Sequence, residues 1–461
     1  MSVDIKTGAA RIAEFVTRAI PPATARERAA AAIRDTIGVI LAGAVERASR
    51  IVQAMAAQDG RGPCRILGTR ERTSPELAAL ANGVAAHALD YDDMCFVSLA
   101  HPSCALVPAA LAAAELTRAP GRSLTEAYVV GFELECRLGT VMNPRHYHQR
   151  GWHCTSSIGT LGAAAAAARI LGLDADATGY ALGIAASAAC GLKENLGTMV
   201  KPLHAGMAAR NGVMAARLAQ QGFTASEQAL DGAQGYLAAM DSQHQALDFA
   251  VADLGSRWEI TQTGITVKLY PSCAATHVAL DTLLDMKRCE GFSARDVDAI
   301  AVEVDSITPR LLIHERPATG LEAKFSMPFC AAAALVYGQL GIDTFDVDRI
   351  QEPVIQALLP RVTMRVNTAF DAKTSMSQAR VTVRLRDGRI YSQCGDGARG
   401  YPGRLTGEEL RTKFTGCARR TMRQEAADHA WLALKEMESI DDVRQLTELF
   451  EFGPGNSGTD V

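Results

Sequence analysis

The chain has 461 residues, of which 48% are hydrophobic and 21% are charged, and its formal net charge is −4. This length exceeds one ordinary hydrophobic core, so we expect two domains. The slightly acidic balance offers no basic surface for nucleic acid, and an anionic ligand would have to be small and bound locally.

The apolar patterning argues against export and against a membrane segment. Residues 1–20 mix charged and apolar side chains, which is typical of an amphipathic helix rather than a secretory signal. No uninterrupted apolar run reaches the roughly 18 to 20 residues that a membrane span needs. The most apolar stretch, Ile158 to Leu173, is dominated by Ala and Gly and suits a tightly packed helix. We therefore expect a cytoplasmic protein.

Helical character extends from about residue 9 to residue 255, where alanine-rich segments are separated by Gly and Pro. One of these helices is predicted to begin at Ser74-Pro75, with Ser as the cap and Pro in the first helical position. After residue 404 the chain returns to helix, and Thr406-Gly407-Glu408-Glu409 is typical of a capped helix start.

The pattern between these helical parts is that of strands. Three segments alternate apolar and polar residues as half-buried strands do: Ala299 to Asp305, Val362 to Val366 and Ala379 to Leu385. Asp387-Gly388 then supplies a hairpin turn. The sequence thus predicts a mainly α protein. A large all-α domain would comprise residues 1–262 and 404–461, and residues 263–403 would form an inserted, smaller α+β lid domain.

Chemistry is expected where polar residues gather beside Gly or Pro. Residues 90–93 (Asp-Tyr-Asp-Asp), followed by His101, would form a loop facing a cleft, or else a solvated loop with a capping Asp. His153 precedes a Gly/Ala-rich helix whose N-terminus could hold a carboxylate. Taken alone, such a histidine is more often a cap or a core residue.

Two lysines are candidate carboxylate ligands. Lys201 stands before Pro202 and is therefore expected to project from a turn. Lys268 opens a second polar segment, with His277 just beyond it. Lone surface lysines are far commoner than ligands, so each is weak evidence by itself.

Two other chemistries are disfavoured by the residues. Cys154 next to His153, or Cys273 near His277, could form a thiol–histidine pair, but no signature of a thiol enzyme accompanies either. His146 and His148 have ligand-capable spacing without an acidic or Cys companion beside them. The 11 cysteines contain no CxxC pair, which disfavours a disulfide framework and structural zinc.

Taken in order, several segments resemble the MmgE/PrpD family. The matching stretches are HALDYDDMCFVSLAHPS at 87–103, GWHCTSSIGTLGAAAAAARILGLD at 151–174, MVKPLHAGMAARNGVMAARLAQQGFT at 199–224, KLYPSCAATH at 268–277 and AKFSMPFCAAA at 323–333. The family includes 2-methylcitrate dehydratases, cis-aconitate decarboxylases and iminodisuccinate epimerases. The resemblance implies a large helical domain with a smaller α+β lid, a homodimer, a small-molecule carboxylate substrate, and no metal or organic cofactor.

The resemblance also implies the residues of the active site. His101 and His153 would form an acid/base pair, with neither role assigned, and Asp90 would orient a histidine ring. The expected substrate ligands are Lys201, Lys268 and His277, which would hold carboxylate oxygens as negative charge develops on them.

This chain resembles the decarboxylases of the family but differs from them at two positions. It has Met94 where those enzymes have Thr, and Phe329 where they have Tyr. Both changes remove a hydrogen-bond donor from the expected pocket. The leading hypothesis is therefore a hydro-lyase of the 2-methylcitrate dehydratase kind. An epimerase of a substituted succinate, slightly favoured by Phe329, comes second and a decarboxylase third. The alternative from another functional class is a carboxylate-binding protein without enzymatic activity. Separately, the Gly- and Arg-rich residues 395–404 could add a cation to the pocket.

Overall fold

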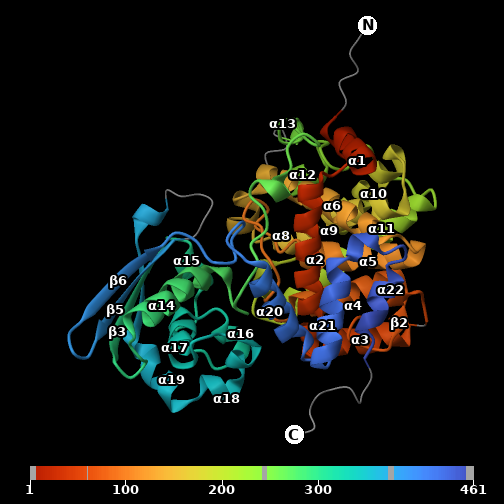
Figure 1. Ribbon diagram of the computed structural model, residues 1–461. Coiled ribbons are helices and arrows are strands. Elements are labelled where there is room, and N and C mark those ends of the chain that lie inside the picture. Colours follow the sequence, from red (N-terminus) through yellow and green to blue (C-terminus); the bar gives the residue numbers. More distant parts are fainter. Residues whose placement is uncertain (1–6, 60, 241–246, 372–377, 453–461) are drawn as a thin grey trace. The chain divides into compact units, whose positions relative to one another are not determined.

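The computed structural model describes residues 7–59, 61–240, 247–371 and 378–452. The chain divides into two compact units (Figure 1). Unit 1 comprises Met1–Ala88, Asp92–Ile265 and Thr406–Val461, and unit 2 comprises Leu89–Tyr91 and Thr266–Leu405. Helices predominate, which confirms the predicted mainly α fold class.

Unit 1 is built from helices, with one short β-ribbon of β1 (Cys64–Arg65) and β2 (Arg72–Thr73). Its helices are α1 (Gly8–Arg18), α2 (Ala23–Gly43), α3 (Arg47–Gln58), α4 (Pro75–His87), α5 (Ser103–Thr117), α6 (Gly121–Met142), α7 (Arg145–His148), α8 (Cys154–Ser157), α9 (Gly159–Leu171), α10 (Ala175–Ala188), α11 (Val200–Gln220), α12 (Tyr236–Ala239), α13 (Leu247–Ala250), α20 (Gly407–Ala418), α21 (Gln424–Lys435) and α22 (Arg444–Thr447).

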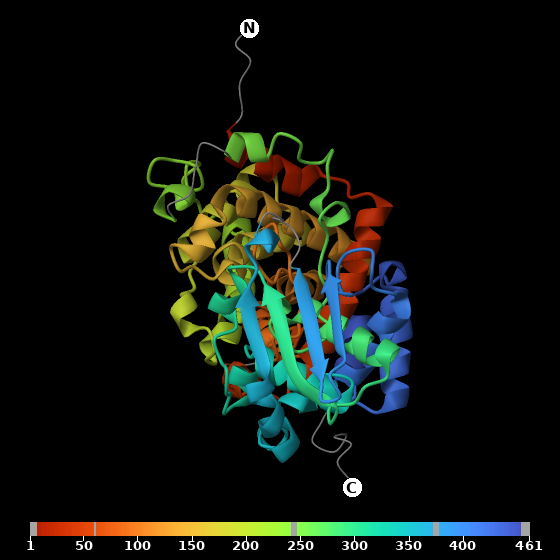
Figure 2. The same ribbon diagram turned by 90° about the vertical axis from the view of Figure 1, so that its left-hand side faces the viewer.

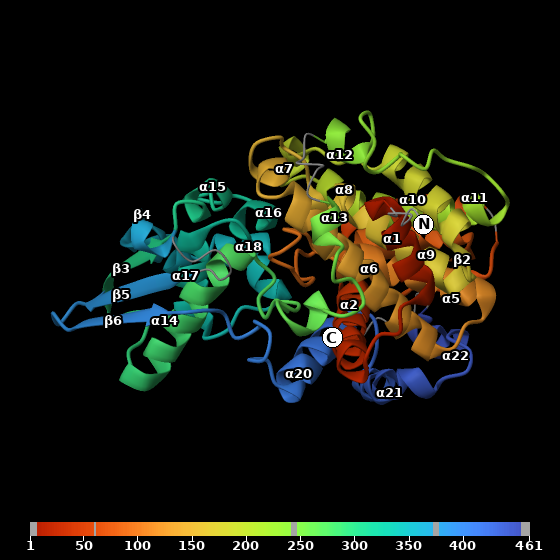
Figure 3. The same cartoon turned by 90° about the horizontal axis from the view of Figure 1, so that it is seen from above.

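The centre of unit 1 is α9, which packs against α5, α6, α10 and α11 (Figure 3). Small residues allow this close approach. A Cβ added to Gly162 would lie 2.6 Å from the Cγ of Glu135 on α6, and one added to Gly212 on α11 would lie 2.5 Å from the Cβ of Ala163. The stretch Cys154–Leu171 is apolar enough by composition to cross a membrane, yet 83% of it is buried inside the protein, as in the core helix of a folded domain.

The predicted helix starts in unit 1 are confirmed. The Ser74 side chain accepts a hydrogen bond from the Leu77 N–H, and α4 begins with proline. Thr406 and Glu409 form a reciprocal capping box at the start of α20. The C-terminal helices return to the N-terminal part of the unit, where Lys413 on α20 forms an ion pair of 2.8 Å with Asp35 on α2.

Unit 2 contains a four-stranded sheet in the order β4-β3-β5-β6, whose strands lie side by side in Figure 2. The strand β3 pairs in parallel with β4 and antiparallel with β5, which pairs antiparallel with β6. Helix α14 contacts β5 and β6, and α17 contacts β4. The elements are β3 (Val297–Val304), β4 (Val362–Val366), β5 (Ala379–Leu385), β6 (Ile390–Gly395), α14 (His277–Glu290), α15 (Thr308–Leu311), α16 (Gly320–Ala323), α17 (Met327–Tyr337), α18 (Val347–Ile350) and α19 (Pro353–Leu358).

The alternating pattern identified these strands correctly. The predicted bounds of β4 and β5 match the structure, and β3 begins two residues earlier and ends one residue earlier than expected. Alternate residues of β5, among them Val381 and Val383, are fully buried, while the residues between them are exposed or half-buried. The sheet therefore presents one apolar face to the core of its own unit.

Candidate active site

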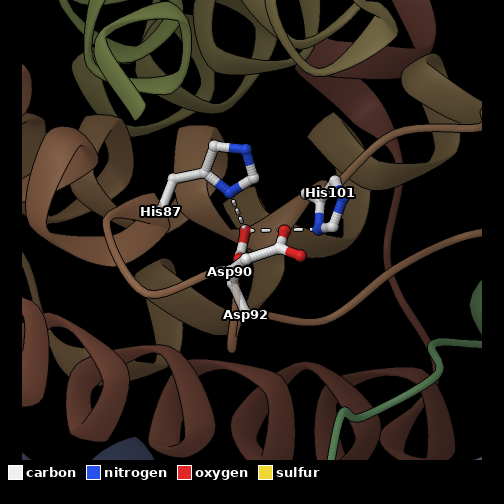
Figure 4. Close-up of side chains that lie close together, drawn as sticks. All are labelled: His87, Asp90, Asp92 and His101. Carbon is white, nitrogen blue, oxygen red and sulfur yellow. Dashed lines mark hydrogen bonds and ion pairs between the residues drawn. The ribbon is translucent and has the colours of Figure 1, made fainter. Parts of the chain in front are cut away.

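A buried carboxylate shared by two histidines forms the centre of the candidate site in unit 1. The Nδ1 of His87 lies 2.7 Å from the Oδ2 of Asp92, and the Nδ1 of His101 lies 3.4 Å from the same oxygen (Figure 4). The side chains of His87 and Asp92 are fully buried, whereas that of His101 is 14% exposed. His101 is thus the member of this group that a ligand or solvent can reach.

The segment that carries this group joins α4 to α5. His87 is the last residue of α4, and the His101 N–H donates a hydrogen bond to the Thr155 Oγ1 at 3.1 Å. The alternative interpretation of residues 90–93 as a solvated loop is wrong for Asp92 and Asp93, because both are fully buried.

Asp93 has a structural role at the start of α5. It accepts hydrogen bonds from the Ser103 hydroxyl and from the Ser103 N–H, and the Tyr128 hydroxyl lies 2.5 Å from the same Ser103 oxygen. Burial raises the pKa of Asp93 to about 8. A carboxyl group of this kind can donate a hydrogen bond at neutral pH, so it closes a buried network without placing a full charge there.

His153 lies directly before α8, as predicted, and its N–H donates to the Gly191 carbonyl at 2.9 Å. Its Nδ1 lies 3.1 Å from the Nδ1 of His204, and its ring is stacked on that of His87 with centroids 5.8 Å apart. Burial lowers the pKa of His153 well below its ordinary value. Lys201 lowers it further through its positive charge, as do His87, His101 and His204 whenever their rings are protonated. His153 is therefore neutral at physiological pH.

The expectation that Lys201 projects from a turn is wrong. Helix α11 begins at Val200, so Lys201 lies in its first turn and is 8% exposed. Pro202 is tolerated there because the first N–H groups of a helix have no partner within the helix. His204 follows three residues later on the same face of α11. Burial lowers the pKa of His153 and of His204, and the positive charge of Lys201 lowers both further.

The other three residues implied by the resemblance lie in unit 2. Lys268 donates to the Asp90 carbonyl oxygen at 2.8 Å and forms an ion pair of 3.0 Å with the Asp90 carboxylate. His277 is the first residue of α14, and its Nε2 lies 3.2 Å from the Ser272 carbonyl oxygen. The ring of Tyr270 packs edge-on against that of His277. The positive charge of Lys268 thus has a carboxylate partner inside its own unit.

Three residues of the site were missed by sequence reasoning, namely His87, Asp92 and His204. All three stand inside the segments that carry the family resemblance. The spacing of three between Lys201 and His204 would place them on one helical face, and it was the available signal for His204. No comparable signal distinguishes Asp92 from its acidic neighbours in the chain.

The structure bears on Cys154 and His146, one residue from each of the two disfavoured chemistries. Burial raises the pKa of the Cys154 thiol to about 12, which keeps it protonated and unsuited to nucleophilic attack. His146 is buried, with its Nε2 2.8 Å from the Ser157 hydroxyl, and burial lowers its pKa to about 4. The side chains of His87, Asp92 and His101 are close enough to hold a metal ion, but the 2.7 Å between the first two is a hydrogen-bond distance.

The sequence features used to choose between reactions were Phe329, Met94 and residues 395–404, and each has a defined place within its own unit. Phe329 is fully buried in unit 2 and packs on Phe345 with ring centroids 5.6 Å apart, so it is a core residue there. Met94 is half-buried in unit 1. In the Gly- and Arg-rich segment, Arg399 forms an ion pair of 2.9 Å with Asp281.

Comparison with known proteins identifies the family. The MmgE/PrpD N-terminal domain matches residues 9–247, and the MmgE/PrpD C-terminal domain matches residues 270–438. A cis-aconitate decarboxylase-like protein of Aspergillus oryzae is 28% identical over 95% of this chain and 96% of its own length. The cis-aconitate decarboxylases of Mus musculus and Homo sapiens are 28% and 29% identical, each over 83% of this chain and 80% of their own length. As the resemblance predicted, the chain belongs to the MmgE/PrpD family and is an enzyme of that family.

Proposed function

We propose that this enzyme is a lyase that acts on a small di- or tricarboxylate through an enolate-like intermediate. One observation supports it above the others: unit 1 combines a histidine kept neutral, His153, with a histidine held against a buried carboxylate, His101. Two titratable groups whose environments favour opposite protonation states are the usual arrangement of an acid and a base.

The environments of the two histidines suggest their roles. His153 is surrounded by positively charged or neutral groups, so it is a base that accepts a proton. His101 faces the Asp92 carboxylate, which favours the imidazolium form and makes His101 the acid. Lys201 would hold a substrate carboxylate and stabilise the negative charge that develops on it.

Decarboxylation is the reaction that we rank first, because the curated relatives reported above are named cis-aconitate decarboxylases or decarboxylase-like. In this step a carbon–carbon bond breaks and CO₂ leaves. Its electron pair remains on the substrate as an enolate, and His101 then donates a proton to carbon. The reaction consumes one proton from solvent for each CO₂ released.

Dehydration of a 2-methylcitrate-like substrate is the second candidate. Here His153 would remove a proton next to a carboxylate, and His101 would protonate the hydroxyl that leaves as water. The paired base and acid favour this reaction, since decarboxylation needs only the acid. The Met94 side chain favours it too, because it lacks the hydroxyl found in decarboxylases that resemble this chain.

The family resemblance supports further parts of the proposal. We propose that Lys268 and His277 bind carboxylate groups of the substrate and that Asp90 orients a catalytic side chain. We also propose a cytoplasmic homodimer with its α+β domain as a lid, and catalysis without a metal or organic cofactor.

A substrate panel followed by NMR tests the proposal. The purified enzyme is incubated with cis-aconitate, 2-methylcitrate, citrate and substituted succinates. A decarboxylase releases CO₂ from the first and a hydro-lyase releases water from the second. Exchange or epimerisation of a succinate without elimination would indicate an epimerase, and binding without any conversion would overturn the lyase proposal.

Variants then test which residues act. H101N is expected to lose at least about 100-fold in kcat/KM in either reaction, and H153Q is expected to lose as much in dehydration, because general acid–base catalysis contributes about 10²- to 10⁴-fold. K201M is expected to lose on the order of 100-fold, because it removes a charge that stabilises the developing negative charge. The matched control is H429Q, since His429 is exposed on α21. Full activity in H153Q would exclude the dehydration candidate, and full activity in H101N would exclude both candidates.

A further inference from the structure

His153 and His204 form a direct hydrogen bond between two imidazole rings. Their Nδ1 atoms lie 3.1 Å apart, and both residues are buried. In such a contact one nitrogen must carry the proton while the other offers its lone pair. At least one of the two rings is therefore neutral on geometric grounds alone.

Hydrogen bonds and close packing hold the backbones of both histidines in place. The Gly191 carbonyl accepts a hydrogen bond from the backbone N–H of His153, and a Cβ added to Gly191 would lie 3.6 Å from the Cγ of His204 and 2.7 Å from the Cβ of Ser156. The Ser156 hydroxyl donates to the His204 carbonyl oxygen at 3.2 Å. Gly191 has a φ of +123°, a conformation that favours glycine. The backbones that carry the two rings thus pack closely around Gly191, where a larger residue would clash with Ser156.

We propose that His204 is a positioning residue for the catalytic base: it accepts a hydrogen bond from the Nδ1–H of His153 and thereby leaves the Nε2 of His153 free to take the substrate proton. This inference rests on the proposed role of His153 as the base, which is the role that His153 has in the dehydration candidate. Because the Nδ1 of His153 is occupied by His204, only its Nε2 can act as the base. A base must be unprotonated at the nitrogen that reacts, so the proton of the neutral ring must sit on Nδ1.

The choice of an imidazole as the partner has a chemical consequence. The titratable groups that face His153 are His87 on α4, His101 in the loop before α5, and Lys201 and His204 on α11. No negative charge is among these four groups. A neutral imidazole orients His153 without favouring its imidazolium form, whereas the Asp92 carboxylate favours that form in His101. The two histidines of the acid/base pair therefore receive opposite partners.

Three substitutions at His204 test the inference. In H204N the side-chain amide oxygen can replace the accepting Nδ1, in H204F no acceptor remains, and in H204D the acceptor carries a negative charge. For dehydration, which uses the base, we expect H204F to lose about 100-fold in kcat with little change in KM, and H204N to regain most of that loss. In H204D the added charge raises the pKa of His153, so the acid limb of the kcat/KM profile moves to higher pH.

A measurement on the resting enzyme needs no substrate and separates this inference from the proposed function. With ¹⁵N-labelled histidine, NMR is expected to show His153 protonated on Nδ1 and unprotonated on Nε2, and H204F is expected to lose this preference. A proton on Nε2 in the wild type would overturn the inference even if the enzyme is a lyase. Equal kcat values for H204N and H204F would also overturn it, because a merely structural role would not depend on the acceptor.

Discussion

Gly206 lies where α11 packs against α4, and this packing places the start of α11, with Lys201, near the end of α4, with His87. A Cβ added to Gly206 would lie 2.5 Å from the Leu80 carbonyl oxygen and 2.7 Å from the Val84 Cγ2, where ordinary contact begins at 3.4 Å. The Leu80 oxygen belongs to the backbone and cannot rotate away. In Gly206→Ala the two helices must therefore separate.

The expected cost of Gly206→Ala follows from this geometry. Overpacking of a core typically lowers the free energy of unfolding by about 1–3 kcal/mol. A misplacement of about 1 Å in catalytic groups costs on the order of 100-fold in rate. We therefore expect kcat to fall on the order of 10- to 100-fold, because the groups on α4 and α11 move relative to each other.

Urea unfolding and steady-state kinetics measure the two effects, and Gly179→Ala is the matched control. Gly179 is also inside a helix, α10, but a Cβ there would meet no atom within 4 Å. Alanine should stabilise that position by about 0.5–1 kcal/mol through its better helix propensity. If Gly206→Ala were as stable and active as the wild type, the close crossing of α4 and α11 would not be what holds the site together.

Three further outcomes follow from the buried charges. Lys413→Met leaves Asp35 buried without its ion-pair partner, so urea unfolding should show a free energy of unfolding lower by about 3–5 kcal/mol. Adding Asp35→Asn should restore most of this loss, and additive losses in the double variant would contradict the reasoning. Asp92→Asn removes the charge that favours an imidazolium, so the basic limb of the kcat/KM profile should move to lower pH and kcat should fall about 100-fold; an unmoved limb would refute the shared carboxylate. Lys201→Gln removes a positive charge that lowers the pKa of His153, so the acid limb of the residual activity should move to higher pH; a shift to lower pH would contradict the stated cause.

Local signals in the sequence were sufficient for much of the fold. Ser74 and Thr406 cap their helices through side-chain oxygens, and the alternation in β4 and β5 gave the bounds of both strands. Lys201 shows where such reasoning fails. The rule that a residue before proline leaves the helix does not apply in the first turn, where the missing N–H has no cost.

The site was harder to predict because its members meet through packing between distant segments. The segments with His101 and His153 were recognised, but the sharing of Asp92 depends on how the loop folds back after α4. His153 and His204 lie 51 residues apart in the sequence and meet only through packing, with Gly191 beside both. Residue type and spacing carry no information about such contacts.

The most direct test of the central claim is product formation in D₂O. The enzyme is incubated with cis-aconitate and, separately, with 2-methylcitrate, and NMR follows both the loss of CO₂ or water and deuterium at carbon. We predict that at least one compound is converted. Decarboxylation would deliver a single deuterium to carbon, and dehydration would be accompanied by solvent exchange at the carbon next to a carboxylate. If neither compound is converted and neither exchanges a proton with solvent, proton transfer by His101 and His153 at a carbon next to a carboxylate is contradicted for these substrates.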